Sequence, residues 1–170
     1  KNIYRSGIDQ LGAMDFSLLF QKLSDVFGGE WVMVCRFHYH VEKMVNWEQL
    51  GSCIVNGNLH DDMAEYLVCA DVLLTDASSS MFDFMLTKKP CFLFFPDLEH
   101  YESVERGFYI SAEELPFKVS KTFSDLISSI EKFSSEDYVA EVEKMIDRFG
   151  YVDDTDSSER VAKYIIGKRK

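Results

Sequence analysis

An alternation of short apolar runs with segments of helical spacing restricts the fold of this chain more than any other feature. Four such runs occur, at residues 30–37, 52–55, 71–74 and 90–95. Runs that are apolar throughout are typical of parallel strands buried on both faces of a sheet. Because helical segments separate the runs, the pattern predicts βαβ units and an α/β fold with a parallel sheet.

Capping residues mark where the first helices begin and end. Apolar residues recur at helical spacing from residue 16 to 27, with Asp15 placed to cap this helix and Gly28 placed to stop it. Asp61 or Asp62 is placed to cap a second helix. These signals predict one helix before the first apolar run and one between the second and third runs.

Prolines divide the second half of the chain. A third helix must end before Pro90, because the residue that precedes a proline resists helical geometry. After Pro116 the spacing is helical, which predicts a helical tail over about residues 120–167. No internal repeat or linker interrupts the chain, so residues 1–170 are expected to form one domain.

The charge balance argues against a nucleic-acid partner. The chain has 18 Lys and Arg against 29 Asp and Glu, a net charge of −11. A protein that holds nucleic acid by its phosphates needs a basic face, and the only basic cluster is the terminal one at residues 168–170. A small anionic ligand stays compatible with this balance if a few cations and backbone N–H groups form a local site.

Cysteine usage and hydropathy indicate a cytosolic protein without a metal site. The four cysteines, Cys35, Cys53, Cys69 and Cys91, each lie in an apolar stretch and form no CxxC pair. They are expected to be reduced core residues rather than zinc ligands or disulfides. No apolar run approaches the ~20 residues that span a bilayer, no signal peptide is visible, and the acidic turn at 153–158 is interpreted as a solvated loop.

The strongest candidate site is the segment 71–84, DVLLTDASSSMFDF, in which a buried strand ends in a polar turn and a helix begins. Ligands of open parallel sheets bind beyond the carboxyl ends of the strands. Unpaired N–H groups at the helix start, together with Thr75, Asp76, Ser78 and Ser79, suit a phosphate or pyrophosphate. The alternative is that Asp76 or Ser78 simply caps the helix.

A second candidate is the segment CRFHYH, where Arg36 and His38 leave a different strand at the same edge of the sheet. Arginine supplies a permanent positive charge. Histidine can donate to a phosphate or transfer a proton near neutral pH. The alternative is that His38 is a packed or surface side chain, since the alternation of Phe37 and Tyr39 also fits ordinary strand patterning.

The third candidate is the long loop after the last apolar run, at residues 96–111. Four carboxylates make this loop acidic, and Arg106 is its only strong cation. Long loops at the carboxyl edge of a sheet are often functional. The alternative is a solvated connection anchored by Tyr101 and Phe108.

Several motifs, in one order, resemble the C-terminal half of the CDP-glycerol glycerophosphotransferases, the teichoic-acid polymerase and primase family. That half carries a strand ending R-x-H-P, then D-[VI]-L-[IL]-T-D-Y-S-S-x-x-F-D-F, K-x-P, Y-D-L-E-x-Y and R-G-F-Y. The resemblance covers about residues 15–166. The matching segments here are 36–39, 71–84, 88–90, 96–101 and 106–109.

The resemblance implies the donor half of a two-domain GT-B enzyme, with a Rossmann-like parallel sheet and flanking helices. The implied reaction moves glycerol phosphate from CDP-glycerol to a hydroxyl of a cell-wall polymer and releases CMP, with no cofactor beyond that substrate. The implied acceptor is membrane-linked and reaches the other half of the enzyme. The full-length protein would then act in the cytoplasm, at the inner face of the plasma membrane.

The resemblance also implies a role for each matching residue. His38 is the expected general acid, which protonates or neutralises the leaving phosphate. Asp83, one helical turn beyond the serines, is expected to reach a ribose or nucleotide hydroxyl, and Arg106 to contact phosphate. The positions that match the donor site near the pyrophosphate are Arg36, Thr75, Asp76, Ser78 and Ser79.

Two departures from the family pattern leave other functions open. Ala77 replaces the tyrosine of T-D-Y-S-S, and Tyr39 replaces the proline after the histidine. Both favour the alternative of a non-catalytic binding module with the same fold, while a GT-B domain that uses a nucleotide sugar is a further alternative. Residues 1–10 have the pattern of a loop, so the first strand of the domain is expected to be missing.

Overall fold

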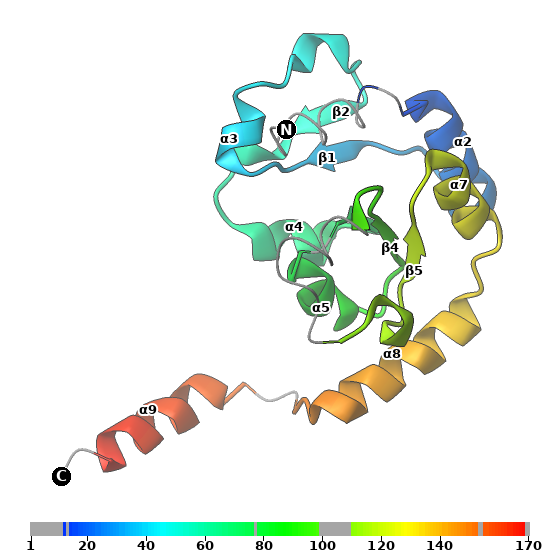
Figure 1. Cartoon of the computed structure of the whole chain (residues 1–170). Helices are drawn as coiled ribbons and strands as arrows, with labels where there is room; N and C mark the ends of the chain where they lie inside the picture. Colours follow the sequence, from blue (N-terminus) through cyan, green and yellow to red (C-terminus); the bar gives the residue numbers. More distant parts are fainter. Residues whose placement is uncertain (1–11, 13, 77, 99–109, 153–154, 169–170) are drawn as a thin grey trace.

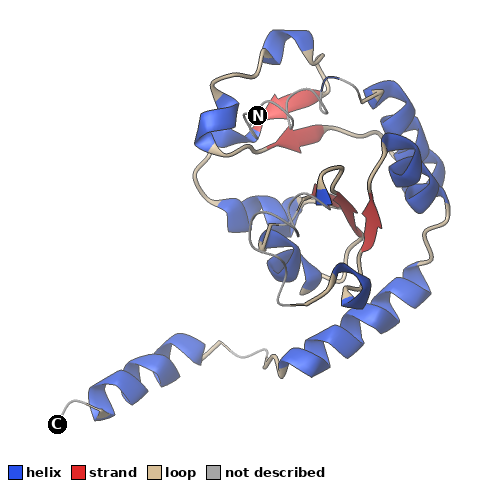
Figure 2. Ribbon diagram, viewed as in Figure 1, coloured by secondary structure: helices blue, strands red, loops and turns tan. Residues whose placement is uncertain are grey.

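The computed structural model describes residues 12, 14–76, 78–98, 110–152 and 155–168, and within them the strands form two parallel sheets (Figure 1). One sheet pairs β1 (Met33–Cys35) with β2 (Ile54–Asn56). The other has the order β3 (Leu73–Thr75), β4 (Cys91–Phe94), β5 (Lys118–Ser120). The predicted α/β class with parallel strands is confirmed, although the described strands form two sheets instead of one (Figure 2).

Helices of very different length separate and follow the strands. The turns of 3₁₀ type lie at Trp47–Gln49, Gly57–Leu59 and Ala112–Glu114. The described α-helices are α2 (Phe16–Phe27), α3 (Tyr39–Glu42), α4 (Met63–Cys69), α5 (Ser80–Met85), α7 (Phe123–Glu131), α8 (Ser135–Phe149) and α9 (Ser157–Gly167).

Strand β4 contributes to two hydrophobic cores, one on each face of its sheet. Successive side chains of a strand point to opposite faces, so Cys91 and Leu93 enter one core with α4, α5 and α8. Phe92 enters the other core with α2 and α7. The prediction of a strand buried on both faces is therefore confirmed for β4, whose first three residues are all buried.

Strand β1 differs from β4, because the side chain on one of its faces is exposed. The Val34 side chain is 45% exposed, and Val55, its register partner on β2, is 44% exposed. The expectation of burial on both faces is wrong for this sheet. The apolar pattern alone does not separate a strand covered on both faces from one covered on a single face.

The predicted end signals of α2 are confirmed. The Asp15 carboxylate accepts a hydrogen bond from the N–H of Leu18 at 3.0 Å, and Gly28 ends the helix with a φ of 77°. Helix α2 lies beside α7 on one face of the sheet (Figure 1). The Phe27 and Phe133 rings meet with their centroids 5.3 Å apart.

Helix α4 is bound at both ends by side chains. Asp62, and not Asp61, caps its start by accepting from the N–H of Ala64 at 2.8 Å. The Lys89 ammonium donates to the carbonyls of Val68 and Ala70 at 3.0 and 2.8 Å, which satisfies acceptors at the other end of the helix. Lys89 thereby joins α4 to the beginning of β4.

The predicted helical tail from about residue 120 to 167 is partly wrong at its beginning. Residues Lys118–Ser120 form β5, and α7 begins only at Phe123, after a capping box between Thr122 and Asp125. A three-residue strand is too short for a periodic signal, so the helical spacing that follows it dominated the pattern. The expectation that residues 1–170 form a single domain stays a prediction.

The cysteines divide into two buried and two exposed residues. Cys35 and Cys91 are buried, whereas Cys53, just before β2, and Cys69, the last residue of α4, are exposed; all four are free thiols. The expectation that each lies in the core is wrong for the exposed pair, because both occupy the ends of elements. No helix within the described ranges is long and apolar enough to cross a membrane.

Candidate active site

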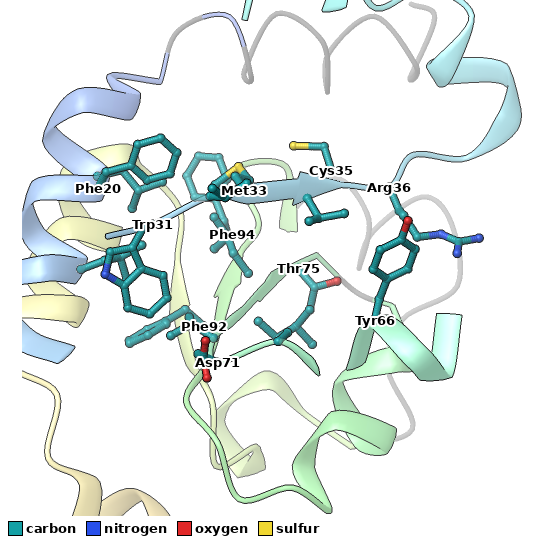
Figure 3. Close-up of a pocket in the computed structure, with 18 of the residues that line it drawn as sticks. Phe20, Trp31, Met33, Cys35, Arg36, Tyr66, Asp71, Thr75, Phe92 and Phe94 are labelled. Atoms are coloured by element: carbon teal, nitrogen blue, oxygen red, sulfur yellow. The ribbon is translucent and has the colours of Figure 1, made fainter. Parts of the chain in front are cut away.

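The carboxyl ends of β1 and β3 open on one cavity of about 630 Å³ (Figure 3). Arg36 follows β1 directly, Thr75 is the last residue of β3 and Asp76 comes next; all three line this cavity together with Tyr66 of α4. Because β1 and β3 belong to different sheets, their carboxyl ends meet at this cavity and not along one paired sheet edge. The structure thus brings together three residues that the sequence predicted from two separate segments.

Arg36 is held at this edge by main-chain acceptors and by an aromatic ring. Its guanidinium donates to the carbonyl of His60 at 2.8 Å and to that of Asp61 at 3.4 Å. It also lies over the Tyr66 ring, 5.6 Å from the centroid, a cation–π contact (Figure 3). Among the described residues, the partners that hold this guanidinium are two carbonyls and an aromatic ring, and none of them neutralises its positive charge.

The loop after β1 is bound to the segment after β2. Asn58 accepts from the N–H of Phe37 at 3.0 Å and donates to the Phe37 carbonyl at 2.6 Å. Gly57 makes this approach possible, since a Cβ there would lie 2.7 Å from Cγ1 of Val34 and 2.8 Å from Cγ of Arg36. These contacts order the chain between Arg36 and α3.

His38 is the N-cap residue of α3. Its carbonyl accepts from the N–H groups of Val41 and Glu42 at 2.7 and 3.1 Å. Its side chain is exposed and lies outside the cavity lining. His38 therefore shares the sheet edge with Arg36, two residues away, but does not share the cavity wall.

The serine turn, residues 78–80 between β3 and α5, contains hydroxyls that differ in their hydrogen bonding. The Ser78 hydroxyl accepts from the hydroxyl of Ser80 at 2.9 Å and from its N–H at 3.4 Å, so the capping alternative describes Ser78 well. Ser79 occupies the N-cap position of α5, is exposed, and makes no side-chain capping hydrogen bond. A structural capping role therefore does not account for the Ser79 hydroxyl.

The Asp76 carboxyl has a raised pKa. Its side chain reaches solvent, but the protein packed around it disfavours the charged form, and the nearby carboxylate of Asp97 adds repulsion. Hydrogen bonds from the N–H groups of Asp76 and Ser78 act in the opposite direction and are outweighed. The site thus favours a protonated carboxyl more than water does.

Ser78, Ser79 and Asp83 are not among the residues that line the cavity. Asp83 is exposed in the first turn of α5, on the same helix as the serines. Arg106 and the departure at Ala77 lie outside the described residues. No cluster of three or more metal-ligating side chains occurs in the part of the chain that the structure describes.

The buried thiol in the cavity wall is not suited to nucleophilic chemistry. Cys35 lines the cavity, and burial raises its pKa to about 11. The thiolate is the reactive form of cysteine. At neutral pH the Cys35 thiol is therefore protonated and forms part of the apolar cavity wall.

Sequence reasoning missed the site roles of Tyr66 and Asn58. Tyr66 has the helical spacing of the core-facing residues of α4, which concealed its contact with Arg36. Asn58 stands in an NGN turn, and its bonds to Phe37 span 21 residues of sequence. Only the pairing of β1 with β2 brings these segments together.

A family model described as CDP-Glycerol:Poly(glycerophosphate) glycerophosphotransferase matches residues 4–167. The chain belongs to this family. The match spans both segments that form the cavity edge and the helices that follow them. The family resemblance expected from the sequence motifs is thereby confirmed.

Similar proteins act in teichoic acid synthesis. The chain is 33% identical over 150 residues to the teichoic acid poly(glycerol phosphate) polymerase of Bacillus subtilis strain 168, covering 86% of this chain and 20% of the relative. It is 32% identical over 154 residues to the teichoic acid ribitol-phosphate primase of Bacillus spizizenii, covering 86% of this chain and 37% of the relative. The chain thus spans well under half the length of these relatives.

Solved structures of the wall teichoic acid polymerase TagF have the same fold. One of them, a variant soaked with CDPG, superposes with a TM-score of 0.73 at 25% identity, covering 93% of this chain and 38% of that chain. The unsoaked polymerase gives a TM-score of 0.72 at 26% identity, covering 90% of this chain and 37% of that chain. The predicted fold, the Rossmann-like half of a GT-B enzyme, is confirmed.

Asp76→Asn should stabilise the folded chain near neutral pH. Because the folded state raises the pKa of this carboxyl above its ordinary 3.8, the folded state binds more protons than the unfolded state over that window. Stability is therefore lost as pH rises through it. The variant, which cannot ionise, should melt at a higher temperature than the parent at about pH 7 and at a similar temperature at about pH 3.

Thermal melts across this pH range provide the measurement, with Asp83→Asn as a matched control on the exposed face of α5. The control should show a smaller difference from the parent at neutral pH. A stability difference for Asp76→Asn that is the same at both pH values would contradict the electrostatic explanation.

Proposed function

We propose that this chain is the donor-nucleotide domain of a glycerophosphotransferase that moves glycerol phosphate from CDP-glycerol to an acceptor hydroxyl and releases CMP. The observation that carries the proposal is the meeting of Arg36, Thr75 and Asp76 around one cavity at the carboxyl edge of parallel strands. The family match supports the donor, as does the likeness to a polymerase structure soaked with CDPG.

Recognition of the donor depends on a local positive charge in an acidic protein. The chain has a net charge of −11, which repels a free pyrophosphate at long range. Arg36 opposes this repulsion with a guanidinium held in place by the His60 carbonyl and the Tyr66 ring. The Ser79 hydroxyl and the backbone of the serine turn add donors from the neighbouring strand end.

The Asp76 carboxyl fits a phosphate site in its protonated form. An ionised carboxylate beside a phosphate oxygen would repel it, whereas a protonated one donates a hydrogen bond to it. The raised pKa of Asp76 lowers the cost of holding that proton. Asp76 would therefore bind the donor more tightly as pH falls toward its pKa.

The proposed reaction is a phosphoryl transfer. The oxygen of the acceptor hydroxyl forms a bond to the phosphorus that carries glycerol, the bond from that phosphorus to the bridging oxygen breaks, and CMP leaves. His38 gives a proton or its positive charge to the leaving phosphate oxygen. The hydroxyl proton passes to a general base in another part of the full-length enzyme.

Asp83 and Arg106 have further roles in the proposed donor site. Asp83 accepts from a ribose or nucleotide hydroxyl, and Arg106 contacts phosphate from the loop at the end of β4. No metal or further cofactor is needed, because Arg36 supplies positive charge. The acceptor is a membrane-linked polymer that reaches the rest of the enzyme at the inner face of the plasma membrane.

Ser79→Ala should weaken binding of CDP-glycerol by about ten- to a hundred-fold, or roughly 1.5–3 kcal/mol, because it removes a donor to a charged phosphate. Titration calorimetry on the 170-residue chain measures this change. Ser124→Ala, which removes an exposed hydroxyl from α7, is the matched control and should bind like the parent. The melting temperature should change little, since the Ser79 hydroxyl makes no capping bond.

Two outcomes would contradict the donor assignment. Unchanged affinity of Ser79→Ala together with a lowered melting temperature would make Ser79 a structural residue. Tight binding of a uridine diphosphate sugar, with no binding of CDP-glycerol, would favour a nucleotide-sugar glycosyltransferase. Tighter binding of CDP-ribitol than of CDP-glycerol would correct the polyol and keep the reaction class.

His38→Ala, made in the full-length enzyme, should lower kcat by about a hundredfold or more while the Kd for CDP-glycerol changes by no more than about threefold. A general acid acts when the leaving oxygen gains charge, so its loss affects the rate more than ground-state binding. The variant should also lose the fall in activity at high pH that deprotonation of a general acid causes.

His60→Ala is the matched control for this prediction. The His60 imidazole contacts Glu65 at 2.7 Å and packs on the Tyr66 ring, with centroids 5.5 Å apart. The variant removes this nearby imidazole and keeps the main-chain carbonyl that accepts from Arg36. Equal losses of kcat in the two variants, with an unchanged pH profile for His38→Ala, would remove the acid role from His38.

A further inference from the structure

Phe37 lies between two residues that have roles in the proposed reaction, although its own side chain has none. Before it stands Arg36, which brings positive charge to the donor, and after it stands His38, the proposed general acid. The peptide bonds on either side of Phe37 are planar, so its two main-chain dihedral angles set how its neighbours are placed relative to each other. A group that fixes the main chain of Phe37 therefore acts on both neighbours.

The Asn58 side chain holds the main chain of Phe37 with two hydrogen bonds. Its amide oxygen accepts from the Phe37 N–H at 3.0 Å, and its amide nitrogen donates to the Phe37 carbonyl at 2.6 Å. One side chain thus pairs both main-chain groups of one residue, as the opposite residue of an antiparallel ladder does. Since the last register pair of β1 and β2 joins Cys35 with Asn56, Asn58 continues the pairing beyond the end of the sheet.

Asn58 is fixed in turn by residues that also hold α3. Its N–H donates to the side-chain oxygen of Asn56 at 2.9 Å. The Asn56 amide nitrogen donates to the carboxylate of Glu42, the last residue of α3, at 3.4 Å. Because α3 begins directly after His38, the chain on both sides of His38 is bound to residues 56–58 at the end of β2 (Figure 1).

The Phe37 side chain adds a further contact. Its ring packs against the ring of Trp47, with the centroids 5.8 Å apart. A rotation of the Phe37 main chain would disturb this ring contact as well as both hydrogen bonds to Asn58. The conformation of Phe37 is therefore determined from two sides, by an amide and by an aromatic ring.

Arg36 and His38 depend on this conformation to different degrees. The Arg36 guanidinium has its own partners, the carbonyls of His60 and Asp61 and the Tyr66 ring. The main-chain bonds of the His38 carbonyl lie within α3 and would move together with that helix. A shift of Phe37 should therefore displace His38 more than it displaces the Arg36 charge.

We propose that Asn58 is a positioning residue for the transfer reaction, which places the His38 imidazole for its proton transfer by holding the main chain of Phe37. This inference rests on the proposed function, in which His38 is the general acid. A displacement of about 1 Å in a reacting group lowers the rate by as much as about a hundredfold. Loss of the Asn58 bonds should therefore slow the chemical step, while donor binding is kept by Arg36.

Asn58→Asp in the full-length enzyme tests this role. When ionised, the new side chain places a carboxylate oxygen against the Phe37 carbonyl oxygen in place of a donor. At about pH 8, kcat should fall by about tenfold or more, with the Kd for CDP-glycerol within about threefold of the parent value. As pH falls toward about 5, a protonated carboxyl can donate to that carbonyl again. The ratio of variant kcat to parent kcat should then rise.

Asn46→Asp is the matched control, because it makes the same exchange at an exposed asparagine that forms no side-chain capping bond. Its kcat should stay within about twofold of the parent at each pH. Asn58→Gln keeps both amide groups on a longer side chain and cannot ionise. It should lower kcat by a factor that does not change with pH, and it carries the same comparisons if the aspartate variant does not fold.

Combination with His38→Ala shows whether Asn58 acts through His38. In the His38→Ala enzyme, a further change of Asn58 to Asp or Gln should lower kcat by less than about twofold, because residues that act as a unit are not additive. Circular dichroism at each pH gives the folded fraction, and kcat is expressed per folded molecule.

Three results would overturn the positioning role and leave the proposed function standing. The first is a kcat for the Asn58 variants equal to that of Asn46→Asp, while His38→Ala shows a large loss. The second is a loss from the Asn58 variants that is the same with and without the His38 imidazole. The third is a Kd that weakens as much as kcat falls. An unchanged kcat for His38→Ala would instead contradict the proposed acid itself, and the role of Asn58 with it.

Discussion

The parallel pairing of β3 with β4 is the interaction on which the rest of the molecule depends. Its register, Leu73 with Cys91 and Thr75 with Leu93, places the end of β3 beside the buried centre of the sheet. Because β4 contributes side chains to both cores, helices on both faces are bound to this pair. The serine turn therefore begins from a rigid position, which a phosphate site needs.

The site combines segments that are rigid for different reasons. Arg36 is oriented by carbonyls and by the Tyr66 ring, and the loop beyond it by two hydrogen bonds to Asn58. The serine turn is positioned by β3 and α5 instead. Arg36 from one sheet and Thr75 from the other thus line one cavity, although the whole chain is acidic.

The sequence predicted most of what depends on local pattern. The apolar run at residues 90–95 gave the correct strand, and the caps at Asp15 and Asp62 mark real helix starts. Features that are very short or long-range were not predicted. Strand β5 has only three residues, too few for a periodic signal. The contact of Arg36 with Tyr66 forms only when two elements that are distant in sequence pack together. The division of the strands into two sheets also depends on which strands pair, and local periodicity does not encode that pairing.

The carboxyl ends of β1 and β3 are proposed to bind a nucleotide donor. Amide chemical shifts of the isotope-labelled chain during titration with CDP-glycerol test it most directly. The largest shifts should occur at residues 36–38 and 75–80, with α8 and α9 unaffected. Largest shifts on the exposed face of α9, or no shift at saturating donor, would contradict it.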